Sequence, residues 1–133
     1  MSCVFCRILQ GEIPCHKVYE DDAVFAFLDI HPIRPGHTLV IPRAHIPHFI
    51  NVEDGTYTRL MGISKRIATA TQALTKPARV GLVIAGFNVP HTHVHVIPLL
   101  DPLDIEPRKR PTSPPAEAFA PMAKTLREAL ARP

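Results

Sequence analysis

The stretch His91-Thr92-His93-Val94-His95-Val96-Ile97-Pro98 decides the fold, because it places a histidine at every second position of a segment rich in β-branched residues. Side chains of a β-strand point alternately to its two faces, so the three imidazoles are expected on one face of a strand. A solvated strand face ordinarily carries Lys, Glu, Thr or Ser rather than three histidines in register. The pattern therefore indicates a chemical site on one face of a β-sheet.

Outward from this strand, the sequence predicts four more strands, a short helical turn over residues 4–9, one long helix and a closing helix. The expected strands cover residues 17–20, 24–28, 38–41, 79–86 and 91–97. Residues 51–76 contain no proline and place apolar side chains at helical intervals, and this spacing returns over residues 117–131. The expected class is α+β: an antiparallel five-stranded sheet with one long helix and a C-terminal helix.

Length and composition favour a single globular domain over residues 1–133. We expect its core over residues 1–98, a proline-rich arm over 99–115 and the C-terminal helix over 116–133. Of the residues, 46% are hydrophobic, but no uninterrupted apolar run approaches the ~18 residues of a membrane span. The first residues have no basic start and no long apolar stretch, so we expect no secretory signal and a cytoplasmic location.

The net charge of +3 bears on the class of binding partner, and the cysteine spacing bears on whether the thiols form disulfides. The basic run Arg108-Lys109-Arg110 is too short for a stripe that follows nucleic-acid phosphates, so we expect no nucleic-acid partner, although a small polyanionic substrate is compatible. Cys3-x-x-Cys6 with an odd Cys15 is not typical of a disulfide framework. Metal binding or simple burial of the thiols is the alternative.

Two chemistries are open for the histidine strand when its residues are considered alone. Three imidazoles could hold a catalytic zinc ion with one position left for water. Alternatively, the central imidazole could attack phosphorus and form a covalent phosphohistidine, with its neighbours fixing its tautomer and neutralising the phosphate.

The histidine stretch resembles the signature of the histidine triad (HIT) family, His-x-His-x-His followed by two apolar residues. Further stretches are similar, in the same order, to the bacterial, Hint-like branch of that family: Cys3-Val4-Phe5-Cys6-Arg7-Ile8, Gly11-Glu12-Ile13-Pro14, Val18-Tyr19-Glu20-Asp21, Phe27-Leu28-Asp29-Ile30 and Gly36-His37-Thr38-Leu39-Val40-Ile41-Pro42-Arg43-Ala44-His45-Ile46. The resemblance covers residues 3–98, and the ordered set is far more specific than the triad alone.

The resemblance implies a homodimer whose sheets join across the interface. It also implies hydrolysis of a purine nucleotide or nucleoside phosphoramidate through a covalent nucleotidyl-histidine. His93 matches the family's nucleophile, His95 would hold the phosphate, and Asp29 would accept the ribose hydroxyls. The residues implied for the base pocket are Val4, Phe5, Ile8, Phe27 and Ile30.

The resemblance also implies a structural zinc ion, because Cys3, Cys6, His45 and His91 match positions that hold one in some bacterial members. Two thiolates and two imidazoles would close a tetrahedral site and leave no place for a catalytic water. The metal and the nucleophile can therefore coexist, with His91 on zinc and His93 left for phosphorus.

The sequence departs from the family pattern just before the triad. Phe87 stands where a glutamine is common and cannot replace its hydrogen bonds, and Asn88 aligns with a phosphate-side serine. Residues 80–84 are almost wholly apolar and lack a common polar asparagine. We expect Asn88 and the backbone N–H of Val89 near the phosphate. The departures keep two alternatives open: a nucleotidyl transferase of the same family, and a weakly catalytic nucleotide-binding or interaction module.

Overall fold

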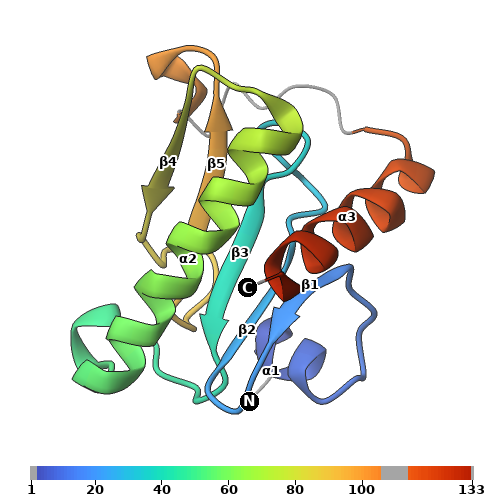
Figure 1. Cartoon of the computed structure of the whole chain (residues 1–133). Coiled ribbons are helices and arrows are strands. Elements are labelled where there is room, and N and C mark those ends of the chain that lie inside the picture. The colour runs from blue at the N-terminus through green and yellow to red at the C-terminus, as the bar shows by residue number, and fades with distance from the viewer. Residues whose placement is uncertain (1–2, 106–113, 133) are drawn as a thin grey trace.

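A five-stranded antiparallel sheet runs through the computed structural model, which describes residues 3–105 and 114–132, with strand order β1-β2-β3-β5-β4 (Figure 1). The strands are β1 (Lys17–Glu20), β2 (Val24–Leu28), β3 (Thr38–Pro42), β4 (Arg79–Val83) and β5 (Val94–Leu99). The helices are α1 (Val4–Leu9), α2 (Asp54–Thr75) and α3 (Phe119–Ala131), with short 3-10 helices η1 (Phe49–Asn51), η2 (Pro102–Ile105) and η4 (Ala116–Ala118). The expected α+β class is confirmed.

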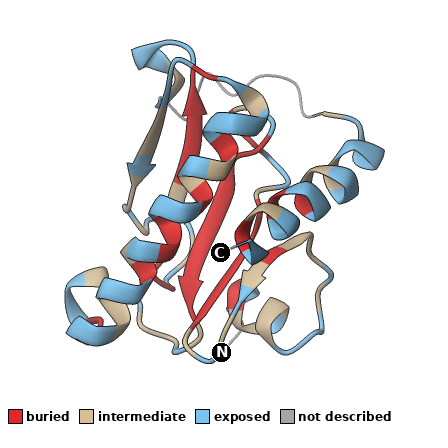
Figure 2. Ribbon diagram, viewed as in Figure 1, coloured by how far each residue is buried: buried red, intermediate tan, exposed pale blue. Residues whose placement is uncertain are grey.

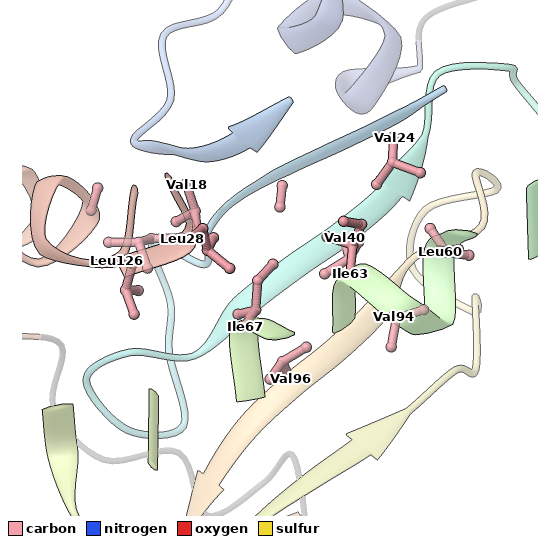
Figure 3. Close-up of a cluster of buried hydrophobic side chains, with 13 residues drawn as sticks. Val18, Val24, Leu28, Val40, Leu60, Ile63, Ile67, Val94, Val96 and Leu126 are labelled. Carbon is pink, nitrogen blue, oxygen red and sulfur yellow. The ribbon is translucent and has the colours of Figure 1, made fainter. Parts of the chain in front are cut away.

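Strand β2 shows how the sheet is covered, because all five of its residues are buried. Val24, Ala26 and Leu28 face the main core, which α2 and α3 close on one side of the sheet (Figures 1 and 3). Phe25 and Phe27 point to the opposite face, where α1 packs. Burial is continuous along β2 and β3 and is interrupted in β5 at His95, which is half-buried (Figure 2). Since α1 has only six residues, it covers only part of the second face.

The histidine strand begins later than the alternation predicts. Its ladder with β3 ends at the pair Val40↔Val94, so His91 and His93 precede β5. Every second residue of β3 directs its backbone groups toward β5. After Val40 the next such residue is Pro42, which has no N–H to donate. Thr92 instead donates its N–H to the Ile46 carbonyl, 2.8 Å away. The predicted strand over 91–97 is therefore wrong at its start, and β5 extends instead to Leu99.

Several other predicted boundaries differ. Strand β4 ends at Val83 rather than at residue 86, where Gly86 has a positive φ of 82°. Helix α2 begins at Asp54 rather than 51, because η1 precedes it. In the proline-rich arm, where regular structure was not expected, Leu99 belongs to β5 and η2 follows; residues 106–113, with the basic run, lie outside the described part. No helix among the described residues is long and apolar enough to cross a membrane.

A glycine turn fixes the entry into β3. Gly36 has φ +99°, a backbone conformation that residues other than glycine rarely adopt. A Cβ at this position would lie 3.3 Å from Thr75 Cγ2 at the end of α2. The turn therefore lies directly against the helix, and His37 follows it as a fully buried residue.

An ion pair holds the same turn to the segment that follows β5. Arg34 contacts both carboxylate oxygens of Asp104, with Nε–Oδ2 at 2.9 Å and Nη2–Oδ1 at 3.1 Å. Oδ2 also accepts the backbone N–H groups of Leu100 and Asp101. The Arg34 guanidinium, and then these N–H groups, lower the pKa of Asp104 to about 2. The turn and η2 are thus one connected unit.

Candidate active site and metal centre

A pocket of about 630 Å³ opens on the sheet face opposite α2, within the range of sites that bind small molecules. One row of side chains crosses its floor from strand to strand, through the register pairs Phe27↔Leu39, Leu39↔His95 and His95↔Val83. His95 therefore lies between apolar side chains of β2 and β3 on one side and of β4 on the other. Among the described residues that line the pocket, there is no lysine or arginine.

The pocket brings together all ten residues expected for catalysis and substrate binding: Val4, Phe5, Ile8, Phe27, Asp29, Ile30, Asn88, Val89, His93 and His95. Four of these come from α1 and β2, and the others from loops and from the start of β5. Ile30 is 56% exposed, so it belongs to the rim rather than the floor. Sequence reasoning did not anticipate the apolar wall on the β4 side, which includes Val83 and Ile97.

The geometry of His93 fixes which of its nitrogens is available. Its Nδ1 lies 2.8 Å from the backbone carbonyl of His91, which can only accept, so Nδ1 carries the proton. Nε2 therefore holds the lone pair. The ring packs edge-on against Phe5, with centroids 5.1 Å apart, and lies 4.9 Å from the ring of His95. Burial lowers the pKa of His93 below its ordinary value, which keeps the imidazole neutral.

His95 is oriented by His37, a residue to which sequence reasoning assigned no role. The N–H of Ile33 donates to His37 Nδ1 at 3.0 Å, so the proton of His37 is on Nε2. That Nε2 lies 2.9 Å from His95 Nδ1 and donates to it. His95 consequently carries its own proton on Nε2. A histidine directly after the Gly36 turn was the available signal, but its meaning depends on the β3–β5 register.

Asp29 lies just beyond the end of β2, as the sequence predicted, and is half-buried on the pocket wall. Its Oδ1 accepts the N–H of His31 at 2.8 Å, which fixes the carboxylate in a local turn. Its Oδ2 lies 3.6 Å from His37 Nε2. The carboxylate therefore belongs to the same polar group as the two histidines.

The four residues expected to hold zinc do converge. The ligand atoms of Cys3, Cys6, His45 and His91 all lie within 4.8 Å of one another. Nδ1 of His91 is 3.5 Å from each sulfur, and Nδ1 of His45 is 3.3 Å from Cys6 Sγ. Zinc bonds of ~2.3 Å to sulfur and ~2.05 Å to nitrogen at tetrahedral angles would separate S and N by about 3.6 Å. The cluster thus has the dimensions of a tetrahedral zinc site.

The protonation of this cluster also fits a metal. His91 Nε2 donates to the Pro42 carbonyl at 2.8 Å, which leaves the Nδ1 lone pair directed at the sulfurs. Without an ion, burial and the adjacent Cys3 raise the pKa of the Cys6 thiol. A divalent cation reverses that preference, because thiolates are the ligands, and two thiolates with two neutral imidazoles balance its charge. Zinc would link the start of α1 to the segment that follows β3, which holds His45, and to the segment that precedes β5, which holds His91.

Comparison with known proteins agrees with this geometry. A family model described as HIT domain matches residues 10–101. An uncharacterized HIT-like protein of Borreliella burgdorferi is 44% identical over 104 residues, which cover 73% of this chain and 75% of that protein. Adenylylsulfatase HINT3 of Arabidopsis thaliana is 36% identical over 73% of this chain, although the match covers only 52% of that protein. The crystal structure of a zinc-bound histidine triad family protein from Mycobacterium smegmatis superposes with a TM-score of 0.80 at 31% identity, over 98% of this chain and 94% of the other.

Proposed function

The chain belongs to the HIT family, and on that premise we propose that it hydrolyses purine nucleoside phosphoramidates through a covalent nucleotidyl-histidine at His93. Members of the family bind nucleotides and are generally hydrolases or transferases. One observation carries the proposal: a neutral imidazole with its lone pair on Nε2 and a second imidazole with its proton on Nε2 share one pocket, with ring centroids 4.9 Å apart. A nucleophile and a donor for phosphate oxygen are thus adjacent.

In the first step, His93 Nε2 attacks the phosphorus and forms an N–P bond. The bond from phosphorus to the leaving amine breaks, its electron pair goes to the amine nitrogen, and that nitrogen takes a proton from water. As His93 becomes positively charged, its Nδ1–H continues to donate to the His91 carbonyl. His95 donates its Nε2–H to a non-bridging phosphate oxygen and stabilises the developing charge. The Asn88 amide and the Val89 N–H are the proposed further donors.

In the second step, water attacks the phosphorus, the N–P bond breaks and its electron pair returns to Nε2. The nucleoside monophosphate leaves, and the proton from water goes to solvent. Asp29 would accept the ribose hydroxyls from its fixed position at the end of β2. Val4, Phe5, Ile8, Phe27 and Ile30 would enclose the base.

Cys3, Cys6, His45 and His91 would hold a structural zinc ion, and their spacing and tautomers support this. When bound, the ion supplies a cross-link and no catalytic water, because all four coordination positions are taken. His91 then joins the two sites, since its ring would bind the metal while its backbone carbonyl orients His93.

A homodimer formed along β4 is the proposed assembly. Strand β4 lies at one end of the sheet, and its outer backbone groups have no strand partner among the described residues. Leu82, on this strand, is 40% exposed. The opposite edge strand, β1, packs against α3 (Figure 1). Leu82→Lys is therefore expected to convert a dimer to a monomer in sedimentation velocity, whereas a dimer that persists contradicts this assembly.

The test of the reaction is turnover of adenosine and guanosine phosphoramidates by the wild-type chain and by His93→Ala. We expect release of nucleoside monophosphate that His93→Ala abolishes, and a nucleotide adduct on the peptide that contains His93 when the reaction is quenched early. Turnover that persists in His93→Ala would falsify the nucleophile assignment. Turnover only with an added acceptor identifies the transferase, and binding without turnover identifies the non-catalytic module.

A further inference from the structure

The pocket extends beyond the part expected to hold the nucleoside. Residues expected around the base and ribose come from α1 and β2, on one side of His95. On the other side lies a second set, here called the β4 lobe: Ile33, Val83, Phe87, Ile97 and Ile105. Strand β4 lies three strand spacings from β2, or about 14 Å. The pocket therefore has room for a group on each side of the histidines.

Every member of the β4 lobe is an apolar side chain. Ile33 and Ile97 are buried and, with Leu99 and Val83, form a packed cluster beneath the lobe. Arg34 and Asp104, which immediately adjoin Ile33 and Ile105, form the bidentate ion pair that joins their two segments. The lobe thus has a rigid floor and a fixed wall before any ligand binds.

Phe87 on the rim of this lobe is 96% exposed, the highest value among the exposed large hydrophobic side chains of the described residues. A phenyl ring exposed to this degree loses the stabilisation that burial gives an aromatic side chain. A ligand in the β4 lobe would cover the ring and recover that stabilisation.

The charges of the pocket point the same way. Among the described residues that line the pocket, Asp29 has the only carboxylate, and there is no lysine or arginine. In the proposed reaction, His93 becomes positively charged as it forms the N–P bond and His95 donates its Nε2–H, so the two histidines serve one phosphoryl group. A leaving group that is itself a phosphate or sulfate would find no counter-charge on the five described side chains of the β4 lobe, and burying an unpaired charge is costly.

We propose that the β4 lobe binds the leaving group and that Phe87 makes the enzyme selective for uncharged, apolar alkyl or arylalkyl amines. The inference rests on the proposed phosphoramidase function and names its substrate class. The leaving amine departs with the electron pair of the P–N bond and takes a proton from water, as in the general reaction. Dinucleoside polyphosphates and adenylyl sulfate are poor substrates, because their leaving groups are anions.

The experiment compares adenosine 5′-phosphoramidates that differ only in the leaving amine: ammonia, 2-phenylethylamine and ethylenediamine, which carries a second, cationic amine. Adenylyl sulfate and a diadenosine polyphosphate complete the panel. For the wild-type chain, we expect kcat/KM at least tenfold higher with phenylethylamine than with ethylenediamine, equivalent to about 1.4 kcal/mol. Phe87→Ser should remove most of this preference, because it should lower kcat/KM far more for the phenylethylamine compound than for the ammonia compound. Ile50→Ser, at a residue 67% exposed outside the pocket, is the matched control.

Equal kcat/KM for the two substituted amines, or faster turnover of adenylyl sulfate or the polyphosphate, overturns the inference. The inference is also overturned if Phe87→Ser slows turnover of all substrates alike, or if sedimentation shows that the variant has a different oligomeric state. In either case the ring serves the fold or an interface. Affinities measured on His93→Ala give a readout that does not need turnover. If the phenylethylamine compound binds no more tightly than the ammonia compound, the lobe does not select its ligand. Absence of turnover with this tighter binding retained refutes only the proposed reaction.

Discussion

Replacing His37 with leucine separates the positioning of His95 from the stability of the fold. His37 is fully buried, accepts the Ile33 N–H at 3.0 Å and donates to His95 at 2.9 Å. Leucine is of similar size but removes both hydrogen bonds. The Ile33 amide is then left without its acceptor, which costs about 1–3 kcal/mol. For a chain of this size, each 1 kcal/mol lowers Tm by about 4 °C.

The effect on the reaction follows from the tautomer of His95. Without the proton donated by His37, nothing in this hydrogen-bond chain keeps the His95 proton on Nε2. Losing a donor to a developing oxyanion costs about 10²–10³ in kcat. His95 itself remains in His37→Leu, so we expect a smaller decrease, roughly 10- to 100-fold, in kcat for an adenosine phosphoramidate. KM should change less, because the base and ribose contacts are untouched.

The assay is steady-state turnover together with urea unfolding of the same preparations. Leu126→Ala is the control: Leu126 is buried in the main core, on the sheet face away from the pocket, and its truncation costs about 2–5 kcal/mol. It should lower stability without lowering kcat. His37→Gln can both accept and donate, so it should recover part of the lost activity. Wild-type kcat in His37→Leu, or an equal decrease in Leu126→Ala, refutes the role given to His37.

Three further predictions concern the acid limb, the metal and the turn. Burial lowers the pKa of His93 below its ordinary value of 6.5. The active neutral form should therefore persist at pH 6.5 and be lost only as the pH falls further. An acid limb of kcat/KM centred above pH 6.5 contradicts this prediction. Elemental analysis should find about one zinc per chain, a chelator should lower Tm, and Cys6→Ser should lose the metal while Cys15→Ser retains it; equal metal content in both variants argues against the site. Gly36→Ala should lower the free energy of unfolding by about 1–3 kcal/mol, since it imposes strain at φ +99° and a 3.3 Å contact with Thr75; unchanged urea midpoints would show that the turn adapts.

Local sequence patterns predicted most of the secondary structure. The hairpin of β1 and β2 has the bounds expected from two β-rich runs around Asp21-Asp22, because turn and strand preferences there act over a few residues. The start of β5 was wrong because it depends on Pro42, a residue of the neighbouring strand. Such dependence cannot be found from the periodicity of the histidine segment itself.

The residues of the candidate site likewise divide into those that sequence reasoning predicted and those that it missed. The resemblance named ten residues for catalysis and substrate binding, and all ten line one pocket. His37 was missed because its contact with His95 joins positions 58 residues apart and follows from the register of β3 and β5. The β4 lobe was missed because its walls come from four separate segments of the chain.

His93 and His95 differ in how far along the chain the residues lie that set their tautomers. The tautomer of His93 is set by a carbonyl two residues away, so it travels with the tripeptide His91-Thr92-His93. Grafting this tripeptide onto another scaffold in the same backbone conformation should therefore carry the proposed nucleophile with its proton already on Nδ1. The proposed phosphate donor does not transfer so easily, because His95 needs a turn, a buried histidine and a backbone amide from distant parts of the chain. Minimal copies that hold only this tripeptide would therefore carry the proposed nucleophile without the proposed phosphate donor, and full turnover would require building the second, non-local half.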